Sequence, residues 1–103
     1  MCALTDVVYV GSVNPTHYDL VKQLLMAGRP ILCEKPLCMN VRQTEELVAL
    51  ARQRDTFLME AVWTRFFPSV RRMMEELKAG TIGEVKHIAA NFGIYTPEGN
   101  RVR

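Results

Sequence analysis

The stretch Ile31-Leu32-Cys33-Glu34-Lys35-Pro36 decides the fold of this chain. Its three apolar residues have the pattern of a buried strand, which stops abruptly at an acid, an amine and a proline. Proline has no N–H to donate, so a sheet ladder does not continue through Pro36, and the preceding Lys35 favours extended geometry. The stretch therefore predicts a primary amine at the carboxyl end of a buried strand, where open α/β sheets bind ligands.

Strand patterns also lie before and after this stretch. The β-branched run Asp6–Gly11 predicts a buried strand that ends in glycine, and Thr56–Val62 predicts a third strand. Helix signals follow each strand, so strand and helix alternate along the chain. This alternation predicts an α/β fold with a parallel sheet and right-handed crossovers.

The helix signals are specific start and stop residues. A helix start combines a capping side chain with proline or an apolar stripe, and a stop is a glycine at the C-terminal end. The starts and stops are Asn14-Pro15 with Gly28, the Asn40/Gln43 capping box, and Pro68 with Gly80.

Composition excludes several function classes. The 103-residue chain has a net charge of +2 and spreads its Lys and Arg along its length, which argues against nucleic-acid binding. No apolar run approaches the roughly 20 residues of a membrane helix, and Met1–Val10 lacks the pattern of a signal peptide. The odd number of cysteines (Cys2, Cys33 and Cys38), in a sequence without a secretory signal, predicts reduced thiols in the cytoplasm. Because Cys33 and Cys38 have no second pair of Cys or His nearby, no metal site is expected.

The pattern of apolar and polar residues changes near Gly83. The run Lys86–Phe92 alternates, with Ile88, Ala90 and Phe92 on one face, which predicts a strand with one wet face. A dinucleotide-binding half normally begins with strand, GxGxxG and helix, and this sequence contains no such glycine cluster. We therefore expect a domain boundary near Gly83 and a chain that is one portion of a larger protein.

Several segments together resemble a known family, and the resemblance covers nearly all of residues 6–93. The sequence looks like the glucose-fructose oxidoreductase/inositol dehydrogenase (Gfo/Idh/MocA) family. Within it, Phe57–Pro68 is similar to the branch whose members oxidise dihydrodiols and D-xylose. The segments that carry the family resemblance are Asp6–Gly11, Asn14-Pro15-Thr16-His17, Ala27-Gly28-Arg29-Pro30 and Cys33-Glu34-Lys35-Pro36.

The resemblance implies an oxidoreductase that uses NADP, with NAD as the alternative, on a small diol or aldose. Residues 1–83 would then be the C-terminal half of a Rossmann-type domain, and residues 84–103 would begin an α+β substrate domain with its first strand. A homodimer is implied as well. The alternative function is a catalytically inactive short form that binds full-length subunits.

Lys35 matches the catalytic lysine of the family. In that role it holds a positive charge near the reacting hydroxyl and relays its proton, while the cofactor takes the hydride. The structural alternative is a solvated loop lysine. The cofactor-binding residues implied by the resemblance and by their place in the crevice are Tyr9, Gly11, Asn14, His17, Glu34 and Lys35.

Most of these residues also have a purely structural alternative. Glu34 serves equally well as an ion-pair partner at the strand end, and His17, in the first turn of a helix, as a structural histidine. Asn14 can cap its helix and still contact a ligand. For Trp63, the sole tryptophan, and Phe92, a wall of the substrate pocket competes with core packing.

Overall fold

The computed structural model describes residues 5–95 and contains a three-stranded parallel sheet. The strands β1 (Val8–Val10), β2 (Ile31–Cys33) and β3 (Leu58–Glu60) lie in the order β1-β2-β3. Their register aligns Val8 with Ile31 and Ile31 with Leu58. These three strands and their parallel arrangement confirm the sequence prediction, and β1 and β3 are shorter than the runs Asp6–Gly11 and Thr56–Val62 that predicted them.

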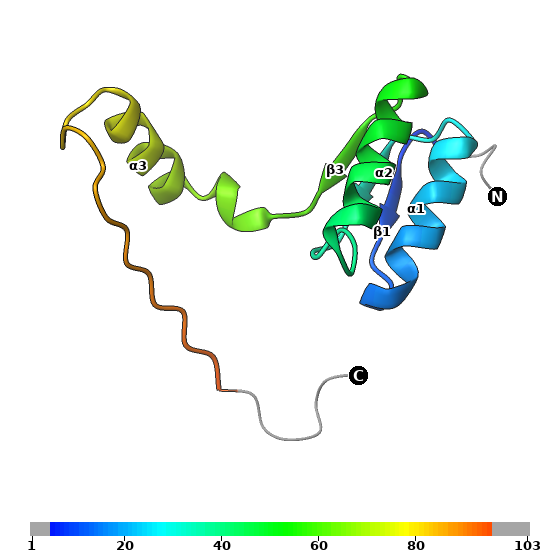
Figure 1. Ribbon diagram of the computed structural model, residues 1–103, viewed down its shortest axis with the longest axis horizontal. Helices are drawn as coiled ribbons and strands as arrows, with labels where there is room; N and C mark the ends of the chain where they lie inside the picture. The colour runs from blue at the N-terminus through cyan, green and yellow to red at the C-terminus, as the bar shows by residue number, and fades with distance from the viewer. Residues whose placement is uncertain (1–4, 96–103) are drawn as a thin grey trace. The chain divides into compact units, whose positions relative to one another are not determined.

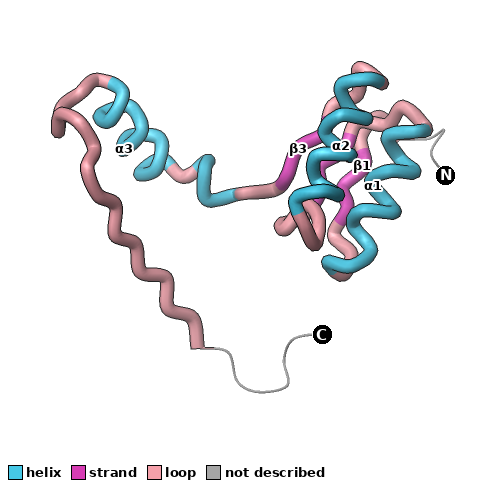
Figure 2. Tube along the Cα trace, in the orientation of Figure 1, coloured by secondary structure: helices cyan, strands magenta, loops and turns pink. Residues whose placement is uncertain are grey.

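Two helices form a second layer on one face of this sheet. α1 (His17–Met26) connects β1 to β2, and α2 (Val41–Gln53) connects β2 to β3. Crossovers between parallel strands are right-handed, so two steps in the same direction across the sheet place both helices on the same side. Figure 1 shows α1 and α2 side by side against the strands, and Figure 2 shows the same two layers as cyan helices and magenta strands.

The core lies between these two layers. Alternate strand residues point to opposite faces of a sheet, so one set faces the helices and the other faces away. Tyr9, Leu32 and Met59 share one row of the register and belong to the set that faces away. The buried apolar residues of the core are Val10, Val21, Leu25, Ile31, Cys33, Leu37, Cys38, Leu47 and Ala51.

All three helices end in the same hydrogen-bond arrangement, in which two backbone amides beyond the helix bond back to its last carbonyls. After α1, the amide of Gly28 donates to Leu25 O and that of Arg29 to Leu24 O, both at 3.0 Å. This Schellman motif needs a left-handed residue, and Gly28 has a φ of 65°. The predicted glycine ends at Gly28 and at Gly80, where φ is 73°, are confirmed.

The helix starts follow the sequence prediction in one case and differ in another. Asn40 caps α2, because its side chain accepts a hydrogen bond from Gln43 N at 3.0 Å. Asn14 is not a capping residue: it begins the short 3-10 helix η2 (Asn14–Thr16), whose N-cap is Val13. The Thr16 hydroxyl donates to Val13 O at 2.8 Å instead, so the turn is closed without the Asn14 side chain.

The structure divides into two units between Val62 and Trp63. The first unit, Met1–Val62, contains the sheet with α1 and α2. The second unit, Trp63–Arg103, contains the 3-10 helix η3 (Trp63–Phe66) and α3 (Pro68–Lys78), which begins at the predicted proline. The boundary expected near Gly83 stays a prediction.

The strand predicted over Lys86–Phe92 is absent from the described part of the chain, where residues 86–95 belong to no helix or strand. A strand is stabilised by backbone hydrogen bonds to a neighbour, and none of residues 5–95 pairs with this segment. Its alternation of apolar and polar residues is therefore a pattern without a partner. The remainder of the predicted second domain, residues 96–103, and Cys2 lie outside the described residues.

Candidate functional site at the carboxyl edge of the sheet

The carboxyl ends of β1 and β2 meet through a contact between two side chains. The Tyr9 hydroxyl donates to Glu34 Oε1 at 2.7 Å. The backbone amides of Glu34 and Lys35 complete the arrangement: Glu34 N donates to Val10 O at 2.8 Å, and Lys35 N donates to Glu34 Oε2 at 3.1 Å. Parallel strands end at the same edge, which explains how residues 25 positions apart meet.

These contacts set the charge of the pair. The Tyr9 hydroxyl and the Lys35 amide both donate to the Glu34 carboxylate and hold its pKa below its ordinary value. The same hydrogen bond, with burial second, raises the pKa of Tyr9. Glu34 therefore stays negatively charged next to the Lys35 amine.

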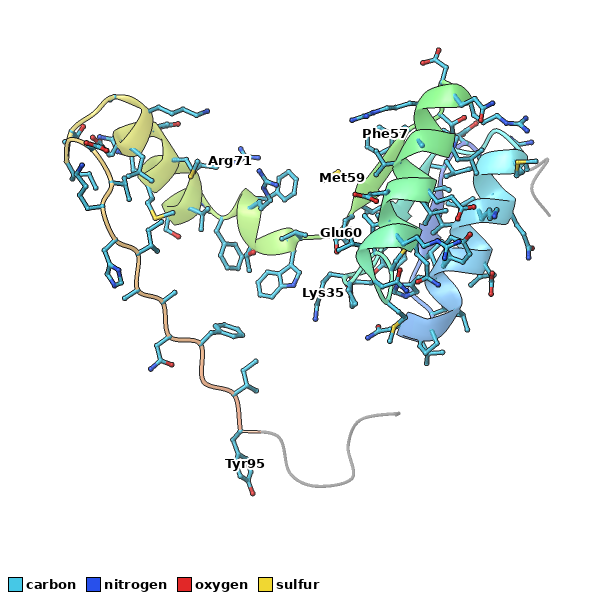
Figure 3. The ribbon with its side chains drawn as sticks, viewed as in Figure 1. Lys35, Phe57, Met59, Glu60, Arg71 and Tyr95 are labelled. Carbon is cyan, nitrogen blue, oxygen red and sulfur yellow. The ribbon has the colours of Figure 1, made fainter. Side chains whose placement is uncertain are left out.

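Lys35 itself is exposed at the end of β2, which is the middle strand of the sheet. The Lys35–Pro36 peptide bond is cis. Figure 3 shows the Lys35 side chain at the rim of the first unit, extending away from it. The amine thus extends from the end of the middle strand and is open to a ligand.

His17 has a different position from the other predicted site residues, because its side chain is fully buried (0% exposed). Its Nδ1 lies 2.8 Å from Pro36 O, and its Nε2 lies 2.9 Å from Ser12 O. A neutral imidazole carries one N–H and donates to one of these two carbonyls at a time. The ring links the loop after β1 to the loop after β2, which is the structural role weighed against direct cofactor contact.

Glu60 is a residue of this edge that the sequence interpretation did not single out. It ends β3, pairs in register with Cys33, and its Oε1 accepts a hydrogen bond from Leu37 N at 2.8 Å. A signal was available: Glu60, like Glu34, is an acidic residue at the end of an apolar strand. Parallel pairing would have placed both at one edge.

Gly11 and Asn14 lie in the loop that leaves β1. A Cβ atom on Gly11 would approach Cε1 of the Tyr9 ring to 3.1 Å, so the glycine lets that ring lie against the backbone. Asn14 is exposed and is the first residue of η2, whose N-cap is Val13. Both residues therefore lie in the segment that follows the carboxyl end of β1, and Asn14 does not cap a helix there.

The two predicted pocket residues belong to the second unit. Trp63 is 50% exposed, and its ring packs edge-on against Phe67 at a centroid distance of 5.1 Å. Phe92 is 79% exposed. Neither side chain is packed into a core of described residues, and their assignment to a substrate pocket stays a prediction.

The two described cysteines are free thiols inside the first unit. Burial raises the pKa of Cys33 to about 11 and raises that of Cys38 as well. No group of three His, Cys, Asp or Glu side chains within residues 5–95 is arranged to hold a metal ion. Over the same residues, no helix has the length and apolar character needed to cross a membrane.

The edge presents an amine, a carboxylate, a phenol and a loop that contains Gly11. The amine and the carboxylate can hydrogen-bond the hydroxyl and amide groups of a dinucleotide. The groups of this edge do not include a glycine-rich phosphate cradle. The residues of this chain thus fit one part of a dinucleotide site.

Comparison with known proteins identifies relatives over most of the chain. A family model described as "Oxidoreductase family, NAD-binding Rossmann fold" (GFO_IDH_MocA) matches residues 2–62. The trans-1,2-dihydrobenzene-1,2-diol dehydrogenase of Xenopus tropicalis is 51% identical over 89 residues, covering 86% of this chain and 27% of the relative. The enzyme of the same name from Sus scrofa is 46% identical over 88 residues, 85% of this chain and 26% of the relative. The chain thus spans about a quarter of the length of these relatives.

Solved structures agree with this result. An oxidoreductase from Pseudomonas syringae matches with a TM-score of 0.75 and 31% identity, covering 79% of this chain and 22% of that one. KijD10, a 3-ketoreductase from Actinomadura kijaniata in complex with NADP and TDP-benzene, matches with a TM-score of 0.68 and 38% identity, covering 78% of this chain and 25% of that one. The Rossmann-type fold predicted for the sheet and its helices is confirmed.

Proposed function

The chain belongs to the Gfo/Idh/MocA oxidoreductase family, and from this premise we propose that it supplies part of the active site of an NADP-dependent dehydrogenase. The substrate is a small diol or an aldose. The diol is supported by the relatives named trans-1,2-dihydrobenzene-1,2-diol dehydrogenase, which are 43–51% identical to the chain.

The observation that carries the proposal is the exposed Lys35 amine at the carboxyl end of the middle strand, with the Glu34 carboxylate beside it in sequence. Ligands of open α/β sheets bind in the crevice outside these strand ends. A lysine in this place can hydrogen-bond the reacting hydroxyl, stabilise negative charge on its oxygen, and pass its proton toward solvent.

The other residues of the edge bind and orient. Glu34, held by Tyr9, offers its remaining lone pairs to N–H or O–H groups of the cofactor, and Gly11 and Asn14 line the crevice along the loop after β1. The nicotinamide, when bound, accepts the hydride. His17 belongs to this group through the loops that it connects.

The second unit contributes to substrate recognition in this proposal. Trp63 and Phe92 are exposed aromatic side chains, and aromatic faces pack well against the ring of a diol or the C–H face of a sugar. The proposal keeps residues 1–83 as the cofactor-binding portion and residues 84–103 as the start of the substrate domain. It also includes a homodimer as the working assembly.

The alternative, an inactive short form that binds full-length subunits, has less support. The relatives that match the chain are named as dehydrogenases, and the carboxyl edge of the sheet carries the amine and the carboxylate that the proposed chemistry uses.

The first experiment is a titration of the purified protein with NADPH, followed through the emission of Trp63. If the carboxyl edge binds cofactor near the substrate wall, saturable quenching is expected because the reduced nicotinamide accepts energy from a nearby indole. Lys35→Met is expected to weaken the quenching. Lys86→Met, which removes a lysine that is 75% exposed and paired with Glu84, is the matched control and is expected to leave it unchanged.

A folded protein whose emission does not respond to NADPH would contradict cofactor binding at this edge. Equal responses of the wild-type protein and Lys35→Met would contradict the assignment of Lys35.

A further inference from the structure

One peptide group next to Lys35 is held by side chains on both of its sides. The peptide joins Pro36 to Leu37. Its carbonyl oxygen lies 2.8 Å from Nδ1 of His17, at the start of α1, and its N–H donates to Oε1 of Glu60, at the end of β3, at 2.8 Å. Side chains from α1 and β3 therefore hold the first peptide beyond the Lys35–Pro36 pair.

We propose that Glu60 is a positioning residue for Lys35, acting with His17 through the Pro36–Leu37 peptide. The inference deepens the proposed function, since it rests on Lys35 as the catalytic residue. Neither side chain needs to touch the substrate for this role.

The geometry of a peptide explains why two contacts are needed. The C=O and N–H of a trans peptide point in opposite directions in one plane, so rotation of the plane breaks both hydrogen bonds together. A single contact would leave the plane free to pivot about it. With His17 on the carbonyl and Glu60 on the amide, the orientation of the plane is fixed.

Proline transmits this orientation to Lys35. The pyrrolidine ring fixes φ of Pro36, and the held peptide fixes its ψ, so no soft backbone torsion remains between them. On its other side, Lys35 is tied through its own amide to Glu34, whose amide is bonded to Val10 in β1. The backbone that directs the amine is therefore held at both ends.

The effect of removing the Glu60 carboxylate can be measured at the amide that it binds. It lines a hollow of about 330 Å³ together with Pro36, Leu37 and the residues that follow them up to the start of α2. Without the carboxylate, water in this hollow can reach the Leu37 amide. Amide hydrogen exchange at Leu37 thus measures the hydrogen bond to Glu60 directly and independently of any enzymatic activity.

The test compares Glu60→Ala, Glu60→Gln and the control Glu46→Ala, which removes an exposed carboxylate of α2 that pairs with Lys22. In Glu60→Ala, exchange at Leu37 is expected to accelerate at least about tenfold, as for an amide that loses its acceptor. Exchange in the centre of β2 should change little. Glu60→Gln keeps an acceptor oxygen and should exchange as the wild type does, and so should Glu46→Ala.

Kinetics supply the second readout. In Glu60→Ala the kcat of NADP-dependent oxidation is expected to fall about tenfold or more, because a misplaced group costs this much, while KM for the cofactor stays within about threefold. Glu60→Gln should recover most of the rate.

Unchanged amide exchange at Leu37 in Glu60→Ala would show that Glu60 does not fix the Pro36–Leu37 peptide. Equal acceleration at all strand amides would also contradict the proposal, because it indicates general destabilisation. Faster exchange with a wild-type kcat would overturn the positioning of Lys35. If the wild-type protein oxidises no diol or aldose, the proposed function and the positioning role fall together. The exchange rate at Leu37 would then still decide whether Glu60 fixes the Pro36–Leu37 peptide.

Discussion

The buried ring of His17 makes the clearest stability prediction. His17→Ala removes a fully buried side chain (0% exposed) and the donor that faces Pro36 O and Ser12 O. Loss of one net hydrogen bond costs about 1 kcal/mol, since the carbonyls of exposed loops regain water. The cavity left by the ring adds about 1.5–2 kcal/mol. The free energy of unfolding should therefore fall by about 2.5–3 kcal/mol.

Urea unfolding followed by far-UV circular dichroism measures this loss. Gln23→Ala, an exposed change on the same helix, is the control and should lower the free energy of unfolding by less than about 0.5 kcal/mol. If His17→Ala behaves like this control and weakens NADPH binding instead, the ring faces the ligand and our structural role for it is wrong.

Three further predictions concern single side chains. Asp55 has a φ of 47° at the end of α2, so Asp55→Gly should raise the free energy of unfolding by about 0.5–1 kcal/mol; a thermal melt with no gain would count against a strained Asp55. Because the pKa of Glu34 is lowered in the folded state, the ionised carboxylate stabilises the fold at pH values above its ordinary pKa. This contribution to stability is lost as the pH falls through the lowered pKa. In Tyr9→Phe an NMR titration should find the Glu34 pKa raised back toward its ordinary value, and an unmoved titration would refute the Tyr9 contact. Cys33 is buried and its pKa is about 11, so in a Cys2→Ser protein it should react with iodoacetamide only as fast as the fold opens. Rapid alkylation of Cys33 in the native state would instead show that its thiol is accessible.

The sequence predicted the sheet well because its signals are local. The three apolar runs, the capping box at Asn40 and the glycines after α1 and α3 each determine their own element, and the structure contains all of them. The strand over Lys86–Phe92 failed for a non-local reason: a strand needs a hydrogen-bonding neighbour, and alternation says nothing of whether one is present.

The site was predicted in part for the same reason. Strand ends placed Tyr9, Glu34 and Lys35 at one edge, but a linear pattern does not give the hydrogen bond between Tyr9 and Glu34. Asn14 has the type of a cap, yet Thr16 closes that turn. The part played by Glu60 depends on register across the sheet and on the path of the loop after β2, which become visible only in three dimensions.

The measurement that tests the central claim most directly is the reduction of NADP by the protein with a trans-dihydrodiol or D-xylose as hydride donor. Wild-type protein and Lys86→Met should reduce NADP at similar rates, and Lys35→Met should lose at least about a hundredfold in kcat, as expected when a proton-transfer group is removed. Equal rates in the wild type and Lys35→Met would contradict the claim that this strand-end lysine carries the chemistry.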